Sequence, residues 1–109
     1  MTMQMRPAAS VSERPRITLE RWAVYETERS EHHFVGYSLE TRSGRVSSAI
    51  VSYDSKTQTG VTRSGRLYVL TGPPSIDEDA EYVWACWSLL NGVLAAKDVS
   101  ETYLKGSSR

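Results

Sequence analysis

Alternating apolar and polar positions mark the first half of the chain as a series of β-strands. β-Branched and aromatic residues recur between Ile17 and Thr71, and short polar stretches with turn residues separate them. An apolar side chain at every second position is typical of a strand that packs one face on a core. This pattern predicts strands at 17–26, 34–40, 45–54, 61–63 and 66–71, the last two forming a hairpin closed at Ser64 and Gly65.

Two of these runs carry irregularities that predict special local geometry. In the first run the apolar positions change parity near Arg21, which indicates either a β-bulge or a strand buried on both faces. In the second run Gly36 interrupts the alternating side chains. Because glycine lacks a Cβ atom, we expect another backbone or a bulky ring to approach closely at this position.

The second half of the chain carries the pattern of one amphipathic helix. The Pro-Pro pair at 73–74 ends the preceding strand, since proline cannot donate to a strand ladder. Ser75 followed by Glu78 has the form of a capping box, so we expect Ser75 to be the N-cap, with Asp77 as the rival cap. The helix is expected to run to about Asn91, and the glycine that follows is the predicted stop.

The predicted helix has two apolar faces, although a helix lying on a sheet needs only one. The main stripe predicts burial against the sheet, with both tryptophans in the core, and comprises Ile76, Ala80, Val83, Trp84, Trp87 and Leu90. The second line comprises Tyr82, Ala85, Cys86 and Leu89. We expect residues 93–104 to fold back over this second line. The alternative is that Tyr82, Cys86 and Leu89 form a surface for a protein partner or for a second copy of the chain.

These elements together predict an α+β fold. We expect an antiparallel meander of about five strands, which can curl toward an open barrel, with one long C-terminal helix packed on one face. Residues 16–104 form the single predicted domain. Proline and small polar residues without apolar periodicity predict a flexible leader over 1–15 and a flexible tail over 105–109.

Composition and charge narrow the classes of protein that the chain can represent. The 109 residues are 39% hydrophobic and 24% charged, unlike a disordered chain, and no apolar run approaches the roughly 20 residues that span a bilayer. The 13 basic and 13 acidic residues balance to a net charge of zero, which disfavours a strongly basic nucleic-acid clamp. A single cysteine and the lack of a signal-peptide pattern predict a cytoplasmic protein that is not associated with a membrane.

A pentapeptide, Thr-Arg-Ser-Gly-Arg, occurs twice in the chain, at 41–45 and at 62–66. Serine and glycine suit tight hairpin turns, so the two copies can be turns without a further role. Alternatively, four arginines gather at one edge of the sheet and form a basic rim that contacts nucleic-acid phosphates. The candidates for such weak nucleic-acid binding are Arg42, Arg45, Arg63 and Arg66.

Patterns typical of catalytic or metal-binding sites are not found in the sequence. His32 and His33, the only histidines, are adjacent, so on an extended chain they point to opposite faces and make a poor metal site. We expect them to lie in a solvated loop. Cys86 lies among apolar neighbours in the predicted helix, which is typical of a small core residue rather than a nucleophile. The sequence therefore predicts no catalytic residues, no metal, no cofactor and no enzymatic activity.

Four short blocks between Gly65 and Gly92 carry a resemblance to known proteins. They are Gly65-Arg66-Leu67-Tyr68-Val69-Leu70, Gly72-Pro73-Pro74, Asp79-Ala80-Glu81-Tyr82-Val83-Trp84 and Asn91-Gly92. Together they resemble small uncharacterised proteins of proteobacterial genomes and their integrated mobile elements. The resemblance implies a bacterial cytoplasmic protein that binds another macromolecule, and it brings no catalytic residues. The functional prediction is a small non-enzymatic module that binds a protein partner, with nucleic-acid binding as the alternative.

Overall fold

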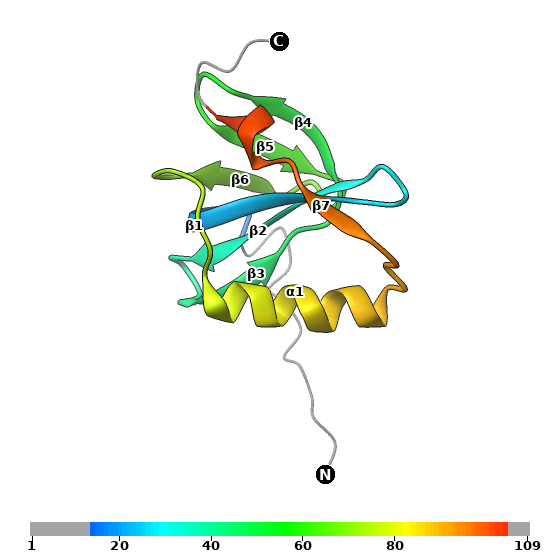
Figure 1. The fold of residues 1–109 in the computed structure, drawn as a ribbon. Helices are drawn as coiled ribbons and strands as arrows, with labels where there is room; N and C mark the ends of the chain where they lie inside the picture. Colours follow the sequence, from blue (N-terminus) through cyan, green and yellow to red (C-terminus); the bar gives the residue numbers. More distant parts are fainter. Residues whose placement is uncertain (1–13, 105–109) are drawn as a thin grey trace.

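The computed structural model describes residues 14–104 and is organised around one long strand, β1 (Arg16–Thr27) (Figure 1). The other elements follow in chain order. They are β2 (His32–Ser38), β3 (Ser43–Val46), β4 (Ile50–Asp54), β5 (Thr59–Thr62), β6 (Leu67–Leu70), the helix α1 (Glu78–Leu90), β7 (Ala96–Asp98) and the short 3₁₀ helix η1 (Ser100–Tyr103).

The expected leader and tail fall mostly on residues 1–13 and 105–109, which lie outside the described residues. The two leader residues that are described take part in the fold. The carbonyl oxygen of Arg14 accepts a hydrogen bond from the Arg66 side chain, and that of Pro15 accepts one from the backbone N–H of Leu67.

The sheet joins two antiparallel series of strands through one parallel pair. Its strand order is β3-β2-β1-β6-β5-β4, and β7 pairs with the far end of β1. The parallel pair is β1 with β6, in which 16–19 runs beside 67–70. The rings of Tyr53 in β4 and Phe34 in β2 have centroids 6.1 Å apart, although three strands separate β4 from β2 in the sheet order. The sheet therefore curls around a common core.

The predicted α+β class is confirmed, but three details of the expected architecture are wrong. The sheet has seven strands rather than about five, because the run 45–54 divides at Ser47 and because the three polar or small residues of β7 carry no strand pattern. The sheet is not a simple meander, because β1 and β6 pair in parallel across a long sequence separation. The helix is not C-terminal, since β7 and η1 follow it.

The predicted bulge in β1 is confirmed at Arg21, whose φ of 47° lies in the left-handed region. The register with β2 shifts between Glu20 and Ala23, so the next side chain, Trp22, turns into the core and is fully buried. The close approach predicted at Gly36 is also confirmed. A Cβ atom there would lie 3.0 Å from the Cα atom of Trp22.

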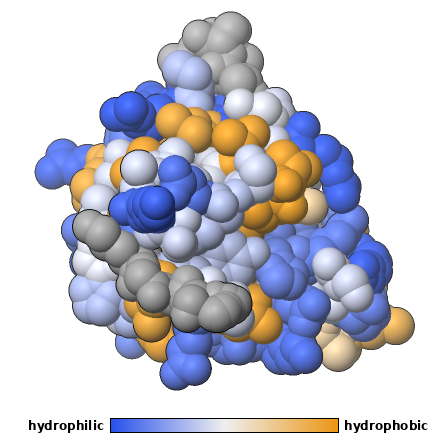
Figure 2. Space-filling view, turned by 90° about the horizontal axis from the view of Figure 1, so that it is seen from above, coloured by the Kyte–Doolittle hydropathy of each residue, from blue (hydrophilic) through white to orange (hydrophobic). Residues whose placement is uncertain are grey.

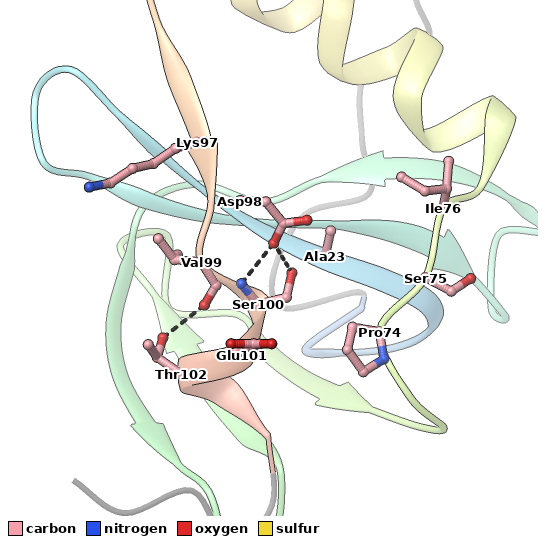
Figure 3. Close-up of a pocket in the computed structure, with 10 residues that line it drawn as sticks. All are labelled: Ala23, Pro74, Ser75, Ile76, Lys97, Asp98, Val99, Ser100, Glu101 and Thr102. Carbon is pink, nitrogen blue, oxygen red and sulfur yellow. Dashed lines mark hydrogen bonds between the residues drawn. The ribbon is translucent and has the colours of Figure 1, made fainter.

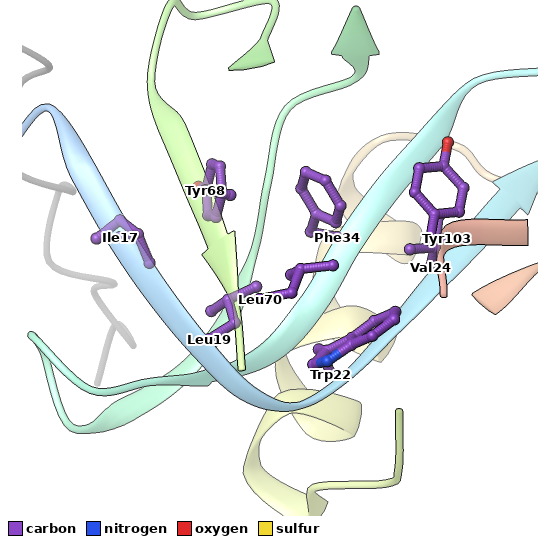
Figure 4. Packing of buried hydrophobic residues seen from close by; sticks show 8 residues of the cluster. All are labelled: Ile17, Leu19, Trp22, Val24, Phe34, Tyr68, Leu70 and Tyr103. Atoms are coloured by element: carbon purple, nitrogen blue, oxygen red, sulfur yellow. The ribbon is translucent and has the colours of Figure 1, made fainter. Parts of the chain in front are cut away.

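The hydrophobic core lies within the curl of the sheet (Figure 4) and receives no residue from α1. Its members are Ile17, Leu19, Trp22, Val24, Phe34, Tyr68, Leu70 and Tyr103. The expectation that the helix tryptophans occupy the core is therefore wrong. Trp84 and Trp87 are half-buried, and Ile76 and Leu90 of the same predicted stripe are 62% and 75% exposed. The helix lies against the outside of β2 and β3, as Figure 1 shows, and only Ala80 of α1 is fully buried.

The N-cap of α1 is Asp77, so the prediction of Ser75 as the cap is wrong. The Asp77 side chain accepts a hydrogen bond from the backbone N–H of Ala80 at 3.0 Å. The backbone N–H of Ser75 instead donates to the carbonyl oxygen of Trp22 in β1. Arg21 binds the other Asp77 oxygen at 2.9 Å, and this long-range ion pair favours the rival cap.

The two copies of the repeated pentapeptide adopt different structures. In the second copy Gly65 has a φ of 91° and closes the hairpin between β5 and β6, as predicted. In the first copy only 41–42 lies in a turn, and Gly44 belongs to β3. A Cβ atom on Gly44 would lie 2.5 Å from the backbone nitrogen of Ala80, so this glycine provides the space in which α1 sits.

The cap assignment predicts unequal costs for two alanine substitutions. Asp77→Ala removes the cap bond and the ion pair with Arg21, and we expect it to lower the free energy of unfolding by about 0.5–2 kcal/mol. Ser75→Ala is the matched control and should have little effect, because the Ser75 side chain is exposed and its backbone bond is retained. Urea denaturation of both variants measures the difference. Equal losses, or a larger loss for Ser75→Ala, would contradict the assignment.

The two glycines of the repeat should also respond differently to substitution. Gly44→Ala drives a methyl group into the backbone of α1 and should cost about 1–3 kcal/mol, with a shift in tryptophan fluorescence as the helix is displaced. Gly65→Ala meets open space but strains the backbone, by about 1–2 kcal/mol, and should leave the fluorescence unchanged. Asparagine tolerates the left-handed region, so Gly65→Asn should recover part of the loss whereas Gly44→Asn should not. Identical behaviour of the two sites would refute the distinction.

Candidate functional site

The inner face of α1 is held on the sheet by a layer of aromatic rings. Trp84 and Trp87 stack on each other with ring centroids 5.4 Å apart and planes inclined by 16°. The ring of His33 in β2 lies 4.6 Å from that of Trp87, and the ring of Tyr25 in β1 lies 5.1 Å from that of Trp84. These are favourable aromatic distances, and they bind the helix to two strands at once.

Charged side chains fix both ends of the helix. At its start, Arg21 reaches the Asp77 carboxylate, as described above. At its end, one guanidinium nitrogen of Arg29 donates to the carbonyl oxygens of Asn91 and Gly92, at 2.7 and 2.8 Å. Positive charge is favourable at a helix C-terminus, where the free carbonyl groups carry partial negative charge. The orientation of α1 is therefore set by contacts at its two ends.

Further hydrogen bonds hold the middle of α1 and the segment that follows it. The hydroxyl of Tyr25 donates to Glu81, and burial together with this carboxylate raises the pKa of Tyr25. The Glu28 carboxylate accepts from the backbone N–H groups of Leu94 and Ala95 at 3.1 and 3.2 Å. None of these contacts uses the outer side of the helix.

The predicted interface residues lie together on the outer face of α1, which we define as Tyr82, Ala85, Cys86 and Leu89. Tyr82 is 62% exposed and Leu89 is 84% exposed, with the half-buried Cys86 between them. The Cys86 thiol, one helical turn further along, raises the pKa of the exposed Tyr82 hydroxyl. Leu94, just beyond the helix, is 87% exposed.

The expectation that residues 93–104 cover this outer face is wrong. Instead of turning back over α1, the chain continues into β7, which pairs with β1. Val99, Tyr103 and Leu104 then pack on the core on the other side of the sheet.

Figure 2 views the molecule from the side opposite α1, where hydrophobic side chains form short stretches among hydrophilic ones.

The four arginines proposed for nucleic-acid binding divide into two pairs. Arg45 is half-buried and its Nε atom donates to the hydroxyl of Tyr68 at 3.0 Å, and Arg66 is buried. Arg42 is exposed, and Arg63 is largely exposed and forms an ion pair with Glu31 at 2.8 Å. Nucleic-acid binding therefore remains a prediction in which Arg42 and Arg63 are the accessible members.

The two histidines lie in β2, so the expectation of a solvated loop is wrong. His33 is buried, and its Nδ1 atom lies 2.9 Å from the carbonyl oxygen of Ser47. His32 lies on the other face of the strand, with its Nδ1 atom 2.6 Å from the hydroxyl of Tyr103 and its Nε2 atom 3.3 Å from Glu26. Each histidine thus joins separate segments of the chain. The shared parity of His33 and the apolar residues of β2 is the signal that could have predicted its burial.

An open groove of about 620 Å³ lies between residues 74–76, which precede α1, and residues 97–102 of β7 and η1 (Figure 3). Two of its polar side chains, Asp98 and Ser100, are engaged in the fold. Asp98 accepts hydrogen bonds from the backbone and side chain of Ser100, whose hydroxyl also accepts from the backbone N–H of Val24. Among residues 14–104, no cluster of three histidine, cysteine or acidic side chains is placed to hold a metal ion.

Comparison with models of protein families, with curated proteins and with solved structures finds no match to this chain. The resemblance to proteobacterial and mobile-element proteins therefore remains a prediction. Within the described part of the chain, no helix is long and apolar enough to cross a membrane.

The buried His33 predicts that the fold loses stability as the pH falls. Burial lowers the pKa of His33, with Arg63 acting in the same direction and Glu31 and the Ser47 carbonyl opposing it. The unfolded chain therefore binds the proton more readily than the folded chain below about pH 6.5. We expect the free energy of unfolding to fall between pH 7 and pH 5, by no more than about 1.4 kcal/mol per pH unit from this group.

Urea denaturation at several pH values tests this expectation. The His33→Gln variant should show a shallower dependence over the same range, and His32→Gln serves as the matched control at the neighbouring position. A wild-type profile that is flat, or one that His33→Gln leaves unchanged, would rule out the burial of a neutral His33.

Proposed function

We propose that this protein is a non-enzymatic protein-binding module that uses the outer face of α1. The observation that carries the proposal is the exposure of Tyr82 and Leu89, two large apolar side chains about two helical turns apart with Cys86 between them. Clustered exposed apolar side chains on a small domain are typical of interaction surfaces. An amphipathic helix presented in this way fits a groove or a second helix on its partner.

The way in which α1 is attached supports this function. The inner face and both ends of the helix are bound to the sheet through Trp84, Trp87, Arg21 and Arg29, so the outer face needs no rearrangement to meet a partner. Full burial of an aromatic or leucine side chain contributes about 1.5–3 kcal/mol. Tyr82 and Leu89 can therefore act as the central anchors of an interface.

Site-specific photo-crosslinking in cells of the source organism tests the proposal. A photoreactive amino acid at position 89 should give covalent adducts, whereas the same group at Thr57, in the exposed β4–β5 turn, should not. Tyr82→Glu should abolish the adducts formed from position 89, because it charges the same face, and Thr57→Glu should leave them intact. Equal labelling from positions 89 and 57, or adducts that persist in Tyr82→Glu, would refute a specific interface on α1.

A further inference from the structure

The sizes of the side chains on the outer face of α1 are symmetric about the middle of the helix. Large side chains, Tyr82 and Leu89, lie at its two ends, and the smaller Ala85 and Cys86 lie at its centre. At about 100° per residue, all four fall within one arc of the helix surface, roughly opposite the buried face that contains Ala80, Trp84 and Trp87. Such a pattern is self-complementary when two identical helices pack antiparallel, because a two-fold axis exchanges the two ends.

The charges at the ends of the helix also favour an antiparallel copy. The first turn is acidic and contains Glu78, Asp79 and Glu81, whereas no basic residue lies in the last turn of the helix itself. The positive charge at the far end comes from Arg29, whose partly exposed guanidinium group binds the carbonyl oxygens of Asn91 and Gly92 and also lies 3.6 Å from the Glu28 carboxylate. A parallel pair would place two acidic ends side by side, whereas an antiparallel pair places each acidic end beside an Arg29.

When the two-fold axis passes between the small residues Ala85 and Cys86, the charged groups of the two copies also lie opposite one another. With the two-fold axis between Ala85 and Cys86, Tyr82 faces Leu89 of the second copy, and Asp79 lies level with Gly92 of the second copy. Arg29 is bound at that level. Small side chains at the crossing point allow the two helix axes to approach to about 8–10 Å, and the larger side chains pack on either side of the crossing.

We propose that the partner of the outer face is a second copy of this chain, and that two α1 helices pack antiparallel with Cys86 near the two-fold axis. This inference rests on the proposed function and specifies its partner. Figure 1 shows α1 at the periphery, with the described strands all on one side of it, so the fold itself leaves room for this approach.

Light scattering of the full chain over a wide concentration range gives the first test. The measured mass should rise with concentration from 12.2 kDa toward twice that value. Leu89→Glu should weaken self-association at least about tenfold, since it buries a charge within the apolar contact. Thr57→Glu introduces the same charge on an exposed turn and should leave self-association unchanged, and circular dichroism confirms that both variants fold.

Crosslinking at Cys86, the single cysteine of the chain, tests the proposed alignment of the two helices. A short bismaleimide should link two copies through Cys86, because the two thiols lie on facing sides of helices that are about 8–10 Å apart. Cys86→Ala combined with Lys56→Cys moves the thiol to the β4–β5 turn and should abolish the linkage. Asp79→Lys should weaken self-association several-fold, because it places a positive charge beside Arg29 of the second copy.

Three results would overturn the inference. They are a chain that stays monomeric at high concentration, a dimer that Leu89→Glu does not affect, and a dimer that Leu89→Glu disrupts but that the reagent does not link at Cys86. A monomeric chain whose position 89 crosslinks to a different protein would overturn the second copy as partner while supporting the proposed function. A monomeric chain without specific crosslinks would overturn both.

Discussion

The bulge at Arg21 is the constraint on which both the core and the helix depend. One extra residue in β1, in the left-handed region, turns Trp22 inward and Arg21 outward. Trp22 becomes the largest fully buried side chain, its indole N–H donates to Gly72, and its carbonyl oxygen accepts from Ser75. Arg21 reaches the Asp77 carboxylate that begins α1. A single irregularity in one strand thus connects the centre of the core to the start of a helix more than fifty residues away.

Features that depend on neighbouring residues could be predicted from the sequence. The parity change at Arg21 and the hairpin closed at Gly65 follow from local backbone chemistry, and the structure agrees with both. Helix geometry alone places Tyr82, Cys86 and Leu89 on one face, whatever lies beside the helix. The grouping of the candidate interface residues was therefore predictable, although its exposure was not.

Features that depend on distant partners could not be predicted. Ser75 and Asp77 are both good caps, and the choice between them was made by Trp22 and Arg21 of β1. The parity of β2 places His33 on the same face as Val35, but the rings that cover it belong to Trp84 and Trp87 of α1, which lie some fifty residues further along the chain. Two identical pentapeptides took different structures, since the helix backbone passes over Gly44 while Gly65 faces open space. The exposure of the outer face was decided by the pairing of β7 with β1, and β7 has only three residues, without an alternating pattern.

Among residues 14–104, the exposed side chains of Tyr82 and Leu89 take no part in the ring contacts, ion pairs and hydrogen bonds that attach α1 to the sheet. The core contains no residue of the helix, and the aromatic layer with the two end contacts accounts for its attachment. Polar side chains at positions 82 and 89 would keep these contacts and would be better solvated. Large apolar side chains there thus carry an association risk without a compensating gain in folding stability, which is the situation expected of a surface used for binding. Because the helix ends are fixed independently of this surface, the free domain already presents it in the orientation that a partner meets, and binding need not order a new segment.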